Sequence, residues 1–297
     1  MSIHVHYNTC PVCNSISIKE YKNVKDYSVS GENFLLMQCA SCSLVFTQNA
    51  PAEDKIASYY QSEEYISHTN TKKDFVSKLY HRVRKITLRL KVSLIVSATE
   101  KVVGHHLDIG AGTGAFVHAM ERAGWNSIGI EPNENARKLA NELYLASIYP
   151  MTELDNFSEA SYTAITMWHV LEHVHHLHDM VRKLSFILDR DGRLFIAVPN
   201  YKSYDARFYQ SNWAAYDVPR HLYHFSYQSM KHLIEQHGLV IEKVKPMWFD
   251  SFYVSMLSEK YKKGSLLRGV MIGFISNCIA FFSKNKCSSL LYVIKRK

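Results

Sequence analysis

The chain has 297 residues, of which 47% are hydrophobic, so it can bury the core of one large domain with an appendage. This composition excludes a disordered or fibrous chain, and the uninterrupted apolar stretches are too short to span a bilayer. The net charge of +8 is confined largely to one basic stretch and a basic tail, which is not the continuous groove of a nucleic-acid-binding protein. No signal peptide pattern opens the sequence, so we expect a cytoplasmic protein with reduced cysteines.

Two C-x2-C pairs, "CPVC" and "CASC", lie within the first 48 residues among short alternating apolar runs. Tetrahedral zinc takes four thiolate ligands, and two close cysteine pairs on facing turns supply them. Residues 1–50 are therefore predicted to form a small zinc-ribbon-like module. Its structural zinc ligands would be Cys10, Cys13, Cys39 and Cys42. Cys278 and Cys287 stand alone and are interpreted as small apolar side chains.

Residues 51–100 are predicted to be a helical connector. Apolar residues at spacings of three and four predict one apolar helix face, formed by Phe75, Leu79, Val83, Ile86, Leu90 and Leu94. The remaining positions are rich in Lys and Arg, so the helix could lie on an anionic membrane. We favour the alternative, in which the apolar face packs on the next domain and the charges are solvated.

From residue 104 onward, apolar strands alternate with helices, which predicts a parallel sheet with helices on both faces. Strands are expected at 162–170 and 192–200, with a helix between them, and two further strands at 240–248 and 288–297. The most apolar segment, residues 266–283, is interpreted as a helical hairpin that caps the sheet, or as a dimer interface. A peripheral membrane contact is the less favoured alternative.

The segment "LDIGAGTGAF" places a glycine-rich turn between a strand and a helix. Asp108 ends the strand, and Gly110, Gly112 and Gly114 follow. Glycines let the chain turn sharply and let a ligand approach the backbone. Glu131 ends the next predicted strand, where a carboxylate can hold ribose hydroxyls. The G-x-G-x-G spacing departs from the dinucleotide fingerprint, which favours a nucleoside cofactor without a pyrophosphate.

These motifs resemble those of class I S-adenosylmethionine-dependent methyltransferases. The resemblance implies a Rossmann-like, doubly wound α/β fold with a mostly parallel seven-stranded sheet over residues 101–297, interrupted by a helical insertion at about 255–286. It also implies that Asp108, Gly110, Gly112 and Gly114 surround the methionine part of the cofactor. Glu131 would bind the ribose of S-adenosyl-L-methionine.

The segment "TMWHVLEHV" resembles the fourth-strand motif of this family, whose first acidic or amide residue borders the methyl-transfer centre. His169 takes that place and is expected to contact the cofactor or the acceptor. Some quinone O-methyltransferases hold a divalent cation with the matching Glu, Glu and His. Glu172 and His173 match this set, whereas His169 departs from it, which disfavours a catalytic cation. His175, His176 and His178 are expected to be mostly solvated at a helix entrance.

A second polar cluster lies in "WAAYDVPRHLYHFS", residues 213–226. His221 is the candidate general base, and Arg220 could hold an anionic acceptor. The segment resembles deoxysugar C-methyltransferases, which carry a four-cysteine zinc module and a histidine placed like His221. They usually have a glutamate where this chain has Arg220, and a further C-terminal domain that this sequence does not show. The alternative is that "DVPRH" anchors the loop structurally.

The sequence therefore predicts a methyltransferase that acts on a small-molecule acceptor such as a sugar, a quinone-like group or a lipid-linked head group. The alternatives are an RNA or other nucleic-acid methyltransferase and a non-enzymatic, zinc-bearing interaction protein on the same scaffold. The zinc module is expected to cover the acceptor site as a lid.

Overall fold

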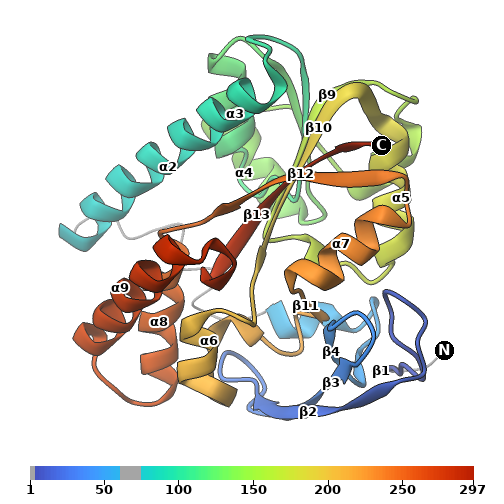
Figure 1. Ribbon diagram of the computed structural model, residues 1–297. Helices are drawn as coiled ribbons and strands as arrows, with labels where there is room; N and C mark the ends of the chain where they lie inside the picture. Colours follow the sequence, from blue (N-terminus) through green and yellow to red (C-terminus); the bar gives the residue numbers. More distant parts are fainter. Residues whose placement is uncertain (1–3, 61–74) are drawn as a thin grey trace.

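The computed structural model describes residues 4–60 and 75–297, with side chains described for residues 4–60 and 86–297. A twisted central sheet carries helices on both faces, and a smaller sheet with the N-terminal segment lies at one end of the molecule (Figure 1). This arrangement is the α/β architecture that the alternation of strands and helices predicts.

The central sheet has seven strands in the order β12-β13-β10-β9-β6-β7-β8. Its strands are β6 (His105–Ile109), β7 (Asn126–Ile130), β8 (Ile148–Tyr149), β9 (Tyr162–Trp168), β10 (Leu188–Pro199), β12 (Leu239–Pro246) and β13 (Ser289–Arg296). All neighbouring pairs are parallel except those that involve β13, which is antiparallel to both β10 and β12. The predicted mostly parallel seven-stranded sheet is confirmed. The helix expected before residues 192–200 ends earlier than the sequence suggested, because β10 already begins at Leu188.

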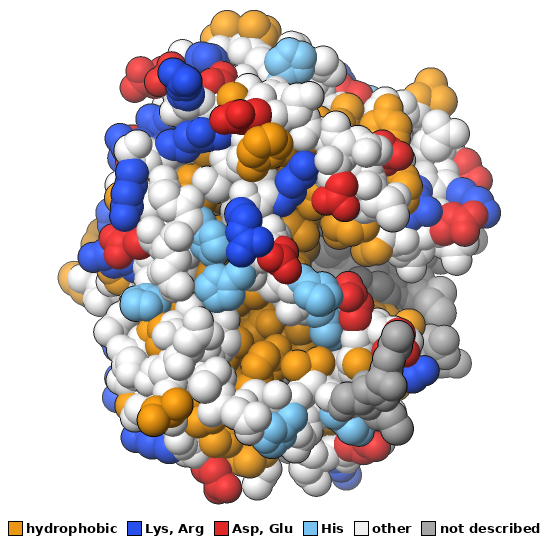
Figure 2. Space-filling view, turned by 90° about the vertical axis from the view of Figure 1, so that its right-hand side faces the viewer, with side chains coloured by type: hydrophobic (Ala, Val, Ile, Leu, Met, Phe, Trp, Pro, Cys, Tyr) orange, Lys and Arg blue, Asp and Glu red, His pale blue; other side chains and the backbone are white. Residues whose placement is uncertain are grey.

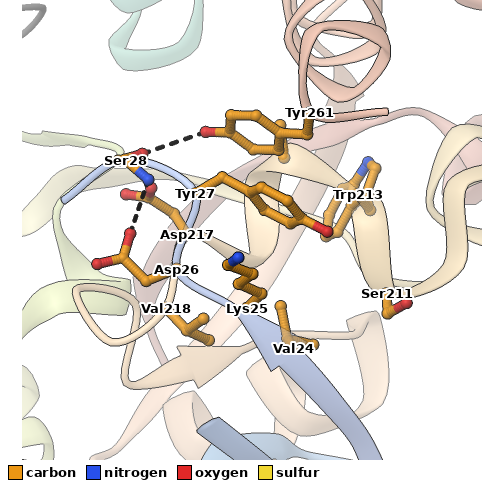
Figure 3. A pocket seen from close by; sticks show the side chains of 11 residues that line it. Val24, Lys25, Asp26, Tyr27, Ser28, Ser211, Trp213, Asp217, Val218 and Tyr261 are labelled. Carbon is orange, nitrogen blue, oxygen red and sulfur yellow. Dashed lines mark hydrogen bonds between the residues drawn. The ribbon is translucent and has the colours of Figure 1, made fainter. Parts of the chain in front are cut away.

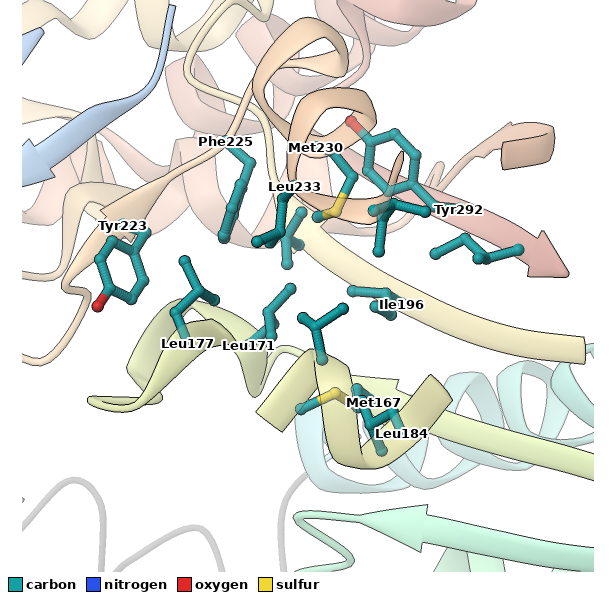
Figure 4. Close-up of a cluster of buried hydrophobic side chains, with 14 of the residues drawn as sticks. Met167, Leu171, Leu177, Leu184, Ile196, Tyr223, Phe225, Met230, Leu233 and Tyr292 are labelled. Carbon is teal, nitrogen blue, oxygen red and sulfur yellow. The ribbon is translucent and has the colours of Figure 1, made fainter. Parts of the chain in front are cut away.

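Both faces of this sheet are buried, as the alternation along β10 shows. Leu194 and Ile196 belong to one apolar cluster, which also contains Leu184 of α5 (Leu177–Ile187) and Leu233 of α7 (Tyr227–Glu235) (Figure 4). Phe195 and Ala197 face the opposite cluster, formed with α2 (Phe75–Thr99) and α3 (Ala115–Arg122). Helix α4 (Glu134–Tyr144) flanks β8 at the sheet edge. Burial on both faces explains why these strands read as continuous apolar runs.

The N-terminal segment forms a second sheet from β2 (Ile18–Lys25), β3 (Asn33–Cys39) and β4 (Val45–Thr47). Its fourth strand is β11 (Tyr223–His224), which comes from the far end of the sequence and pairs antiparallel with β4. A short pair of β1 (His4–Val5) and β5 (Ala50–Pro51) closes the segment. The main apolar cluster runs from Leu44 and Phe46 of this segment into the central sheet without a break.

After α6 (Tyr204–Tyr209) and β12, helices α8 (Asp250–Tyr261) and α9 (Leu266–Phe282) form an antiparallel hairpin at the lower left of Figure 1. The apolar segment 266–283 is thus one helix of a hairpin whose first helix begins at Asp250, five residues before the predicted insertion. Within residues 4–60 and 75–297, no helix combines the length and apolar character needed to cross a bilayer.

The packed face of α2 differs from the predicted face. Leu88, Val92 and Ile95 belong to the apolar cluster on this face of the sheet, as does Leu94 of the predicted face, whereas Ile86 and Leu90 are exposed. The side chains of Phe75, Leu79 and Val83 lie outside the described residues. The predicted face is therefore confirmed at Leu94 and wrong at Ile86 and Leu90, because the packed positions follow a face rotated from the one that the apolar spacing indicated.

Candidate functional site

The glycine-rich loop joins β6 to α3 at the carboxyl end of the central sheet. Gly110, Gly112 and Gly114 have φ angles of 73°, 53° and 76°, all in the left-handed region that favours glycine. A Cβ on Gly110 would come within 2.4 Å of Val170, so this residue is also fixed by close packing. The loop therefore needs glycine for conformation at all three positions.

Glu131 follows β7 and is held against this loop. Its carboxylate accepts hydrogen bonds from the Gly112 amide and the Asn133 amide, each at 2.9 Å. The side chain is half-buried, so it keeps a surface toward solvent beside the loop. The structure thus brings together the two motifs that the sequence placed on separate strands.

Asp108 lies beneath the loop and is almost fully buried. Burial raises its pKa to about 7, although Thr166 Oγ1 donates a hydrogen bond to its Oδ1 at 2.5 Å. Thr166 is in turn 3.0 Å from Nε2 of His106, a buried histidine whose Nδ1 is 2.8 Å from Ser127. These buried side chains hold the carboxyl group of Asp108 in one orientation.

Lys91 of α2 is a site residue that the sequence did not single out. Its ammonium lies 3.8 Å from the centroid of the Trp168 ring, and burial lowers its pKa while the charge of Asp108 opposes that shift. We expected the charges of this helix to be solvated. The signal that could have found Lys91 is its position between Leu88 and Ile95, on the packed face.

A cavity of about 420 Å³ lies next to the segment that follows β9. Its walls come from this segment, the 214–221 loop, α8 and the N-terminal segment, and its lining includes Ser28, Tyr60, His169, His173, Asp217, Arg220, His221, Asp250, Tyr253 and Tyr261. The volume is in the range of pockets for small molecules. All three candidate catalytic residues, His169, Arg220 and His221, lie on this wall.

His169 comes directly after β9 in a left-handed conformation, with φ of 57°. Its Nε2 is 3.0 Å from Asp250 and its Nδ1 is 3.4 Å from Glu172. Burial opposes a charge here, but the two carboxylates raise the pKa of His169 to about 10. The two carboxylates therefore favour the protonated form of His169, which disfavours it as a general base.

His221 and His173 point into the same space as the buried Glu172. Their rings lie 4.5 Å apart, and each Nδ1 lies within 3.0 Å of a backbone carbonyl, that of Ala215 for His221 and that of Arg220 for His173. Nδ1–H donation to a carbonyl leaves Nε2 as the unprotonated nitrogen. Burial and the neighbouring His221 lower the pKa of His173 to about 4.

One ligand atom each from Glu172, His173 and His221 lies within 4.8 Å of the others, so these residues could hold a divalent cation. This set differs from the Glu, Glu and His of the quinone O-methyltransferases. His169 takes the place of the first acid, and its ring lies against the carboxylate of Glu172. A divalent cation beside Glu172 is therefore disfavoured in the structure, as it was from the sequence.

Arg220 is engaged by protein groups. Its guanidinium donates to both carboxylate oxygens of Asp217, with Nε at 3.0 Å from Oδ2, and its Nη1 donates to the Tyr59 carbonyl at 2.7 Å. Against the effect of burial, this guanidinium lowers the pKa of Asp217. These contacts favour a role in shaping the loop over direct binding of an anionic acceptor.

The four cysteines of the N-terminal segment converge. Cys10 Sγ is 3.5 Å from Cys42 Sγ, Cys13 Sγ is 3.5 Å from Cys39 Sγ, and all four ligand atoms lie within 4.8 Å of one another. A tetrahedral zinc site with Zn–S bonds of about 2.3 Å requires sulfur atoms roughly 3.8 Å apart. The donor set and its spacing therefore fit zinc. Of the two lone cysteines, Cys287 is buried, whereas Cys278 is exposed.

This cysteine-bearing sheet fixes the backbone around His221. The Thr47 amide donates to the Leu222 carbonyl at 2.9 Å, and Thr47 Oγ1 donates to the His221 carbonyl at 2.7 Å. On the other side, the Leu222 amide donates to the Glu172 carbonyl at 2.8 Å. His221 is thus held between β4 and the segment that follows β9.

Histidine side chains gather across the middle of the face shown in Figure 2. His178 Nε2 lies 3.1 Å from the Pro11 carbonyl, and His175 Nε2 lies 3.1 Å from the Pro51 carbonyl. Of the three histidines expected to be mostly solvated, only His176 is exposed. The prediction was wrong for the other two because they dock the N-terminal segment onto α5.

The N-terminal segment also packs on the end of α8 (Figure 3). Tyr27 stacks on Tyr261 with ring centroids 4.6 Å apart, and the hydroxyls of Ser28 and Tyr261 are 3.2 Å apart. The crevice between these side chains has a volume of only about 10 Å³, roughly one water molecule. It is a packed junction beside the large cavity.

Residues of this chain match a known protein family. The profile of a family described as "Methyltransferase domain" matches residues 75–244, more than half of the chain. The chain belongs to this methyltransferase-domain family. The match includes the glycine loop, Glu131 and the segment from His169 to His224.

Curated relatives of this methyltransferase-domain protein include ubiquinone biosynthesis O-methyltransferases from two strains of Actinobacillus pleuropneumoniae. They are 34% and 33% identical to it over 105 aligned residues, and the match covers 32% of this chain. The chain spans about half the length of these relatives, because the match covers 45% of each.

Solved structures share the fold at low sequence identity. Magnesium protoporphyrin IX methyltransferase from Synechocystis is 15% identical, with a TM-score of 0.54 over 83% of this chain and 100% of that chain. Geranyl diphosphate C-methyltransferase from Streptomyces coelicolor is 16% identical, with a TM-score of 0.51 over 80% of this chain and 87% of that chain. These likenesses support the Rossmann-like architecture.

Proposed function

We propose that this protein is an S-adenosylmethionine-dependent methyltransferase that acts on a small-molecule acceptor. The observation that carries the proposal is the Glu131 carboxylate held against the left-handed glycine loop after β6. The neighbouring strand β9 leads into His169, which lines a cavity of about 420 Å³. A nucleoside could lie along this loop with its ribose at Glu131. The cavity would take a compact polar acceptor such as a sugar, a quinone-like group or a lipid-linked head group.

When bound, S-adenosyl-L-methionine supplies a methyl group on a sulfonium centre. Glu131 would accept hydrogen bonds from the ribose, and the Lys91 ammonium would balance the carboxylate of the methionine part. Nε2 of His221 would take the proton from the acceptor nucleophile as the new bond forms. Arg220 would position His221 by anchoring the loop through Asp217 and Tyr59.

The test uses methyl-labelled S-adenosylmethionine with the purified protein and fractionated cell extract. Label in the small polar or lipid-extractable pool is the expected result. Label in the nucleic-acid fraction would overturn the acceptor class and favour the nucleic-acid alternative. If S-adenosylhomocysteine does not bind at all, the protein is a zinc-bearing interaction module on a methyltransferase scaffold.

Glu131→Gln is expected to weaken binding of S-adenosylhomocysteine by about 1.5 kcal/mol, roughly tenfold, because hydrogen bonds to a charged acceptor become bonds to a neutral one. Titration calorimetry measures the change. Glu134→Gln is the matched control, since Glu134 is an exposed acid on α4 that pairs with Lys138. Equal affinity of the Glu131 variant and the wild type would remove the ribose assignment.

We also propose that zinc occupies the four-cysteine site as a structural ion and that the protein is cytoplasmic, where its thiols stay reduced. The spacing of the sulfur atoms supports the first proposal. In this proposal residues 1–50 act as part of the wall that covers the acceptor, since Ser28 lines the cavity together with Tyr60 of the connector.

A further inference from the structure

Helix α9 turns its large apolar side chains away from the protein. Leu267, Phe274 and Phe281 are 81%, 60% and 74% exposed. With Val270 and Met271 they recur at helical spacing, so these five residues form one outer stripe. A surface helix normally buries such a stripe and presents polar residues to solvent.

The inner face of α9 packs against the protein through Ile272 and several small residues. A Cβ on Gly269 would lie 2.7 Å from the Met256 Cα, and one on Gly273 would lie 2.8 Å from the Phe252 Cα. Ser276 is fully buried and donates a hydrogen bond to Asp205 at 2.9 Å. The helix therefore cannot rotate to bury the outer stripe without losing its close packing on α8.

Positive charge surrounds the outer stripe. Lys262 and Lys263 precede α9, Lys284 follows it, and all three are exposed. From residue 260 to the end of the printed sequence there is no Asp or Glu. This combination of an apolar stripe and flanking cations complements a surface that is apolar within and anionic at its boundary.

We propose that the α8–α9 hairpin docks this protein onto an anionic lipid bilayer, with α9 lying in the plane of the interface. A second copy of the chain fits this surface less well. In a symmetric dimer the same patch meets itself, so lysines at both ends of α9 would approach lysines of the other copy. The outer stripe inserts among lipid tails, and the lysines contact phosphate head groups.

This orientation relates the bilayer to the cavity. Asp250, Tyr253 and Tyr261 on α8 line the cavity, so one hairpin carries the cavity wall and the lipid-facing stripe. If the proposed methyl transfer holds, docking would bring the cavity to acceptors that reside in the membrane. Binding to lipid does not depend on that transfer, so a vesicle assay tests this inference separately.

The experiment is co-sedimentation of the full chain with phosphatidylcholine vesicles, with and without phosphatidylglycerol. We expect strong binding only to the anionic vesicles and weaker binding at high salt. Replacing Leu267, Phe274 and Phe281 together with Gln is expected to weaken binding by at least about tenfold. The matched control replaces Leu143 and Leu145, which are exposed apolar residues at the end of α4, with Gln.

A second variant carries both Lys262→Glu and Lys284→Glu, and it tests the contribution of charge while the outer stripe is unchanged. We expect it to lose the preference for anionic lipid. Thermal melting checks that each variant is folded. Absence of binding to anionic vesicles by the wild type would overturn the proposal. A second result would also overturn it: the wild type is a dimer, and the triple variant is a monomer that binds vesicles as well as the wild type does. The outer stripe would then be a self-association surface.

Discussion

Cys39→Ser is expected to remove zinc and to destabilise the whole protein by about 4 kcal/mol or more, the range of losses that follow removal of a structural metal. Cys39 is buried in the main apolar cluster and faces Cys13 across the four-cysteine site. Three remaining thiols cannot complete the tetrahedral set. We expect a markedly lower melting temperature and a zinc content near zero by metal analysis.

The control for this variant is Cys278→Ser, which alters an exposed cysteine remote from the site and should leave zinc content and melting unchanged. The effect should extend to catalysis, because Thr47 of the same sheet holds the His221 carbonyl. Full stability and normal zinc content in the Cys39 variant would refute the proposed structural site.

His221→Asn is expected to slow methyl transfer by about a hundredfold, the usual loss on removing a general base, with affinity for S-adenosylhomocysteine unchanged. The reason is that His221 lines the cavity. Its Nδ1 contacts the Ala215 carbonyl, and its Nε2 lies 3.8 Å from Asp217 and would take the proton of the acceptor. Steady-state rates of methyl transfer by the variant and the wild type check this result.

His176→Asn is the matched control, since that side chain is exposed outside the cavity lining. An alternative outcome identifies His221 as a metal ligand instead. If a chelator abolishes wild-type activity while the cysteine-bound zinc is retained, and an added divalent cation restores activity, the group formed with Glu172 and His173 is a cation site. Equal rates for the variant and the wild type would leave His221 with only a structural role.

The parts of the site that depend on local sequence could be predicted. The three glycines share a conformation that other residues rarely adopt, and Glu131 follows directly after a strand, so both are visible as short patterns. The cysteine pairs are similarly local, and the structure brings them together at the distance that zinc needs. Strand alternation was enough to predict the parallel sheet.

The residues that the sequence missed reach the site through tertiary packing. Lys91 lies on the packed face of α2. The spacing of apolar residues in the sequence indicated a different face of this helix. Asp250 comes from a hairpin far along the chain, yet it is the partner of His169 Nε2. No spacing rule connects residues 81 positions apart, so the charge state of His169 could not be inferred from its motif.

The pairing of β11 with β4 joins the N-terminal segment to the methyltransferase domain in one sheet, and one apolar cluster runs through both. If the segment were cut away, the Tyr223–His224 backbone would become an open strand edge, and Tyr223, Phe225 and Leu222 would lose apolar neighbours. An unpaired strand edge with exposed apolar neighbours can pair with the same edge of another copy of the chain. A fragment without the cysteine module should therefore aggregate, because the module completes a sheet that the rest of the chain leaves unfinished.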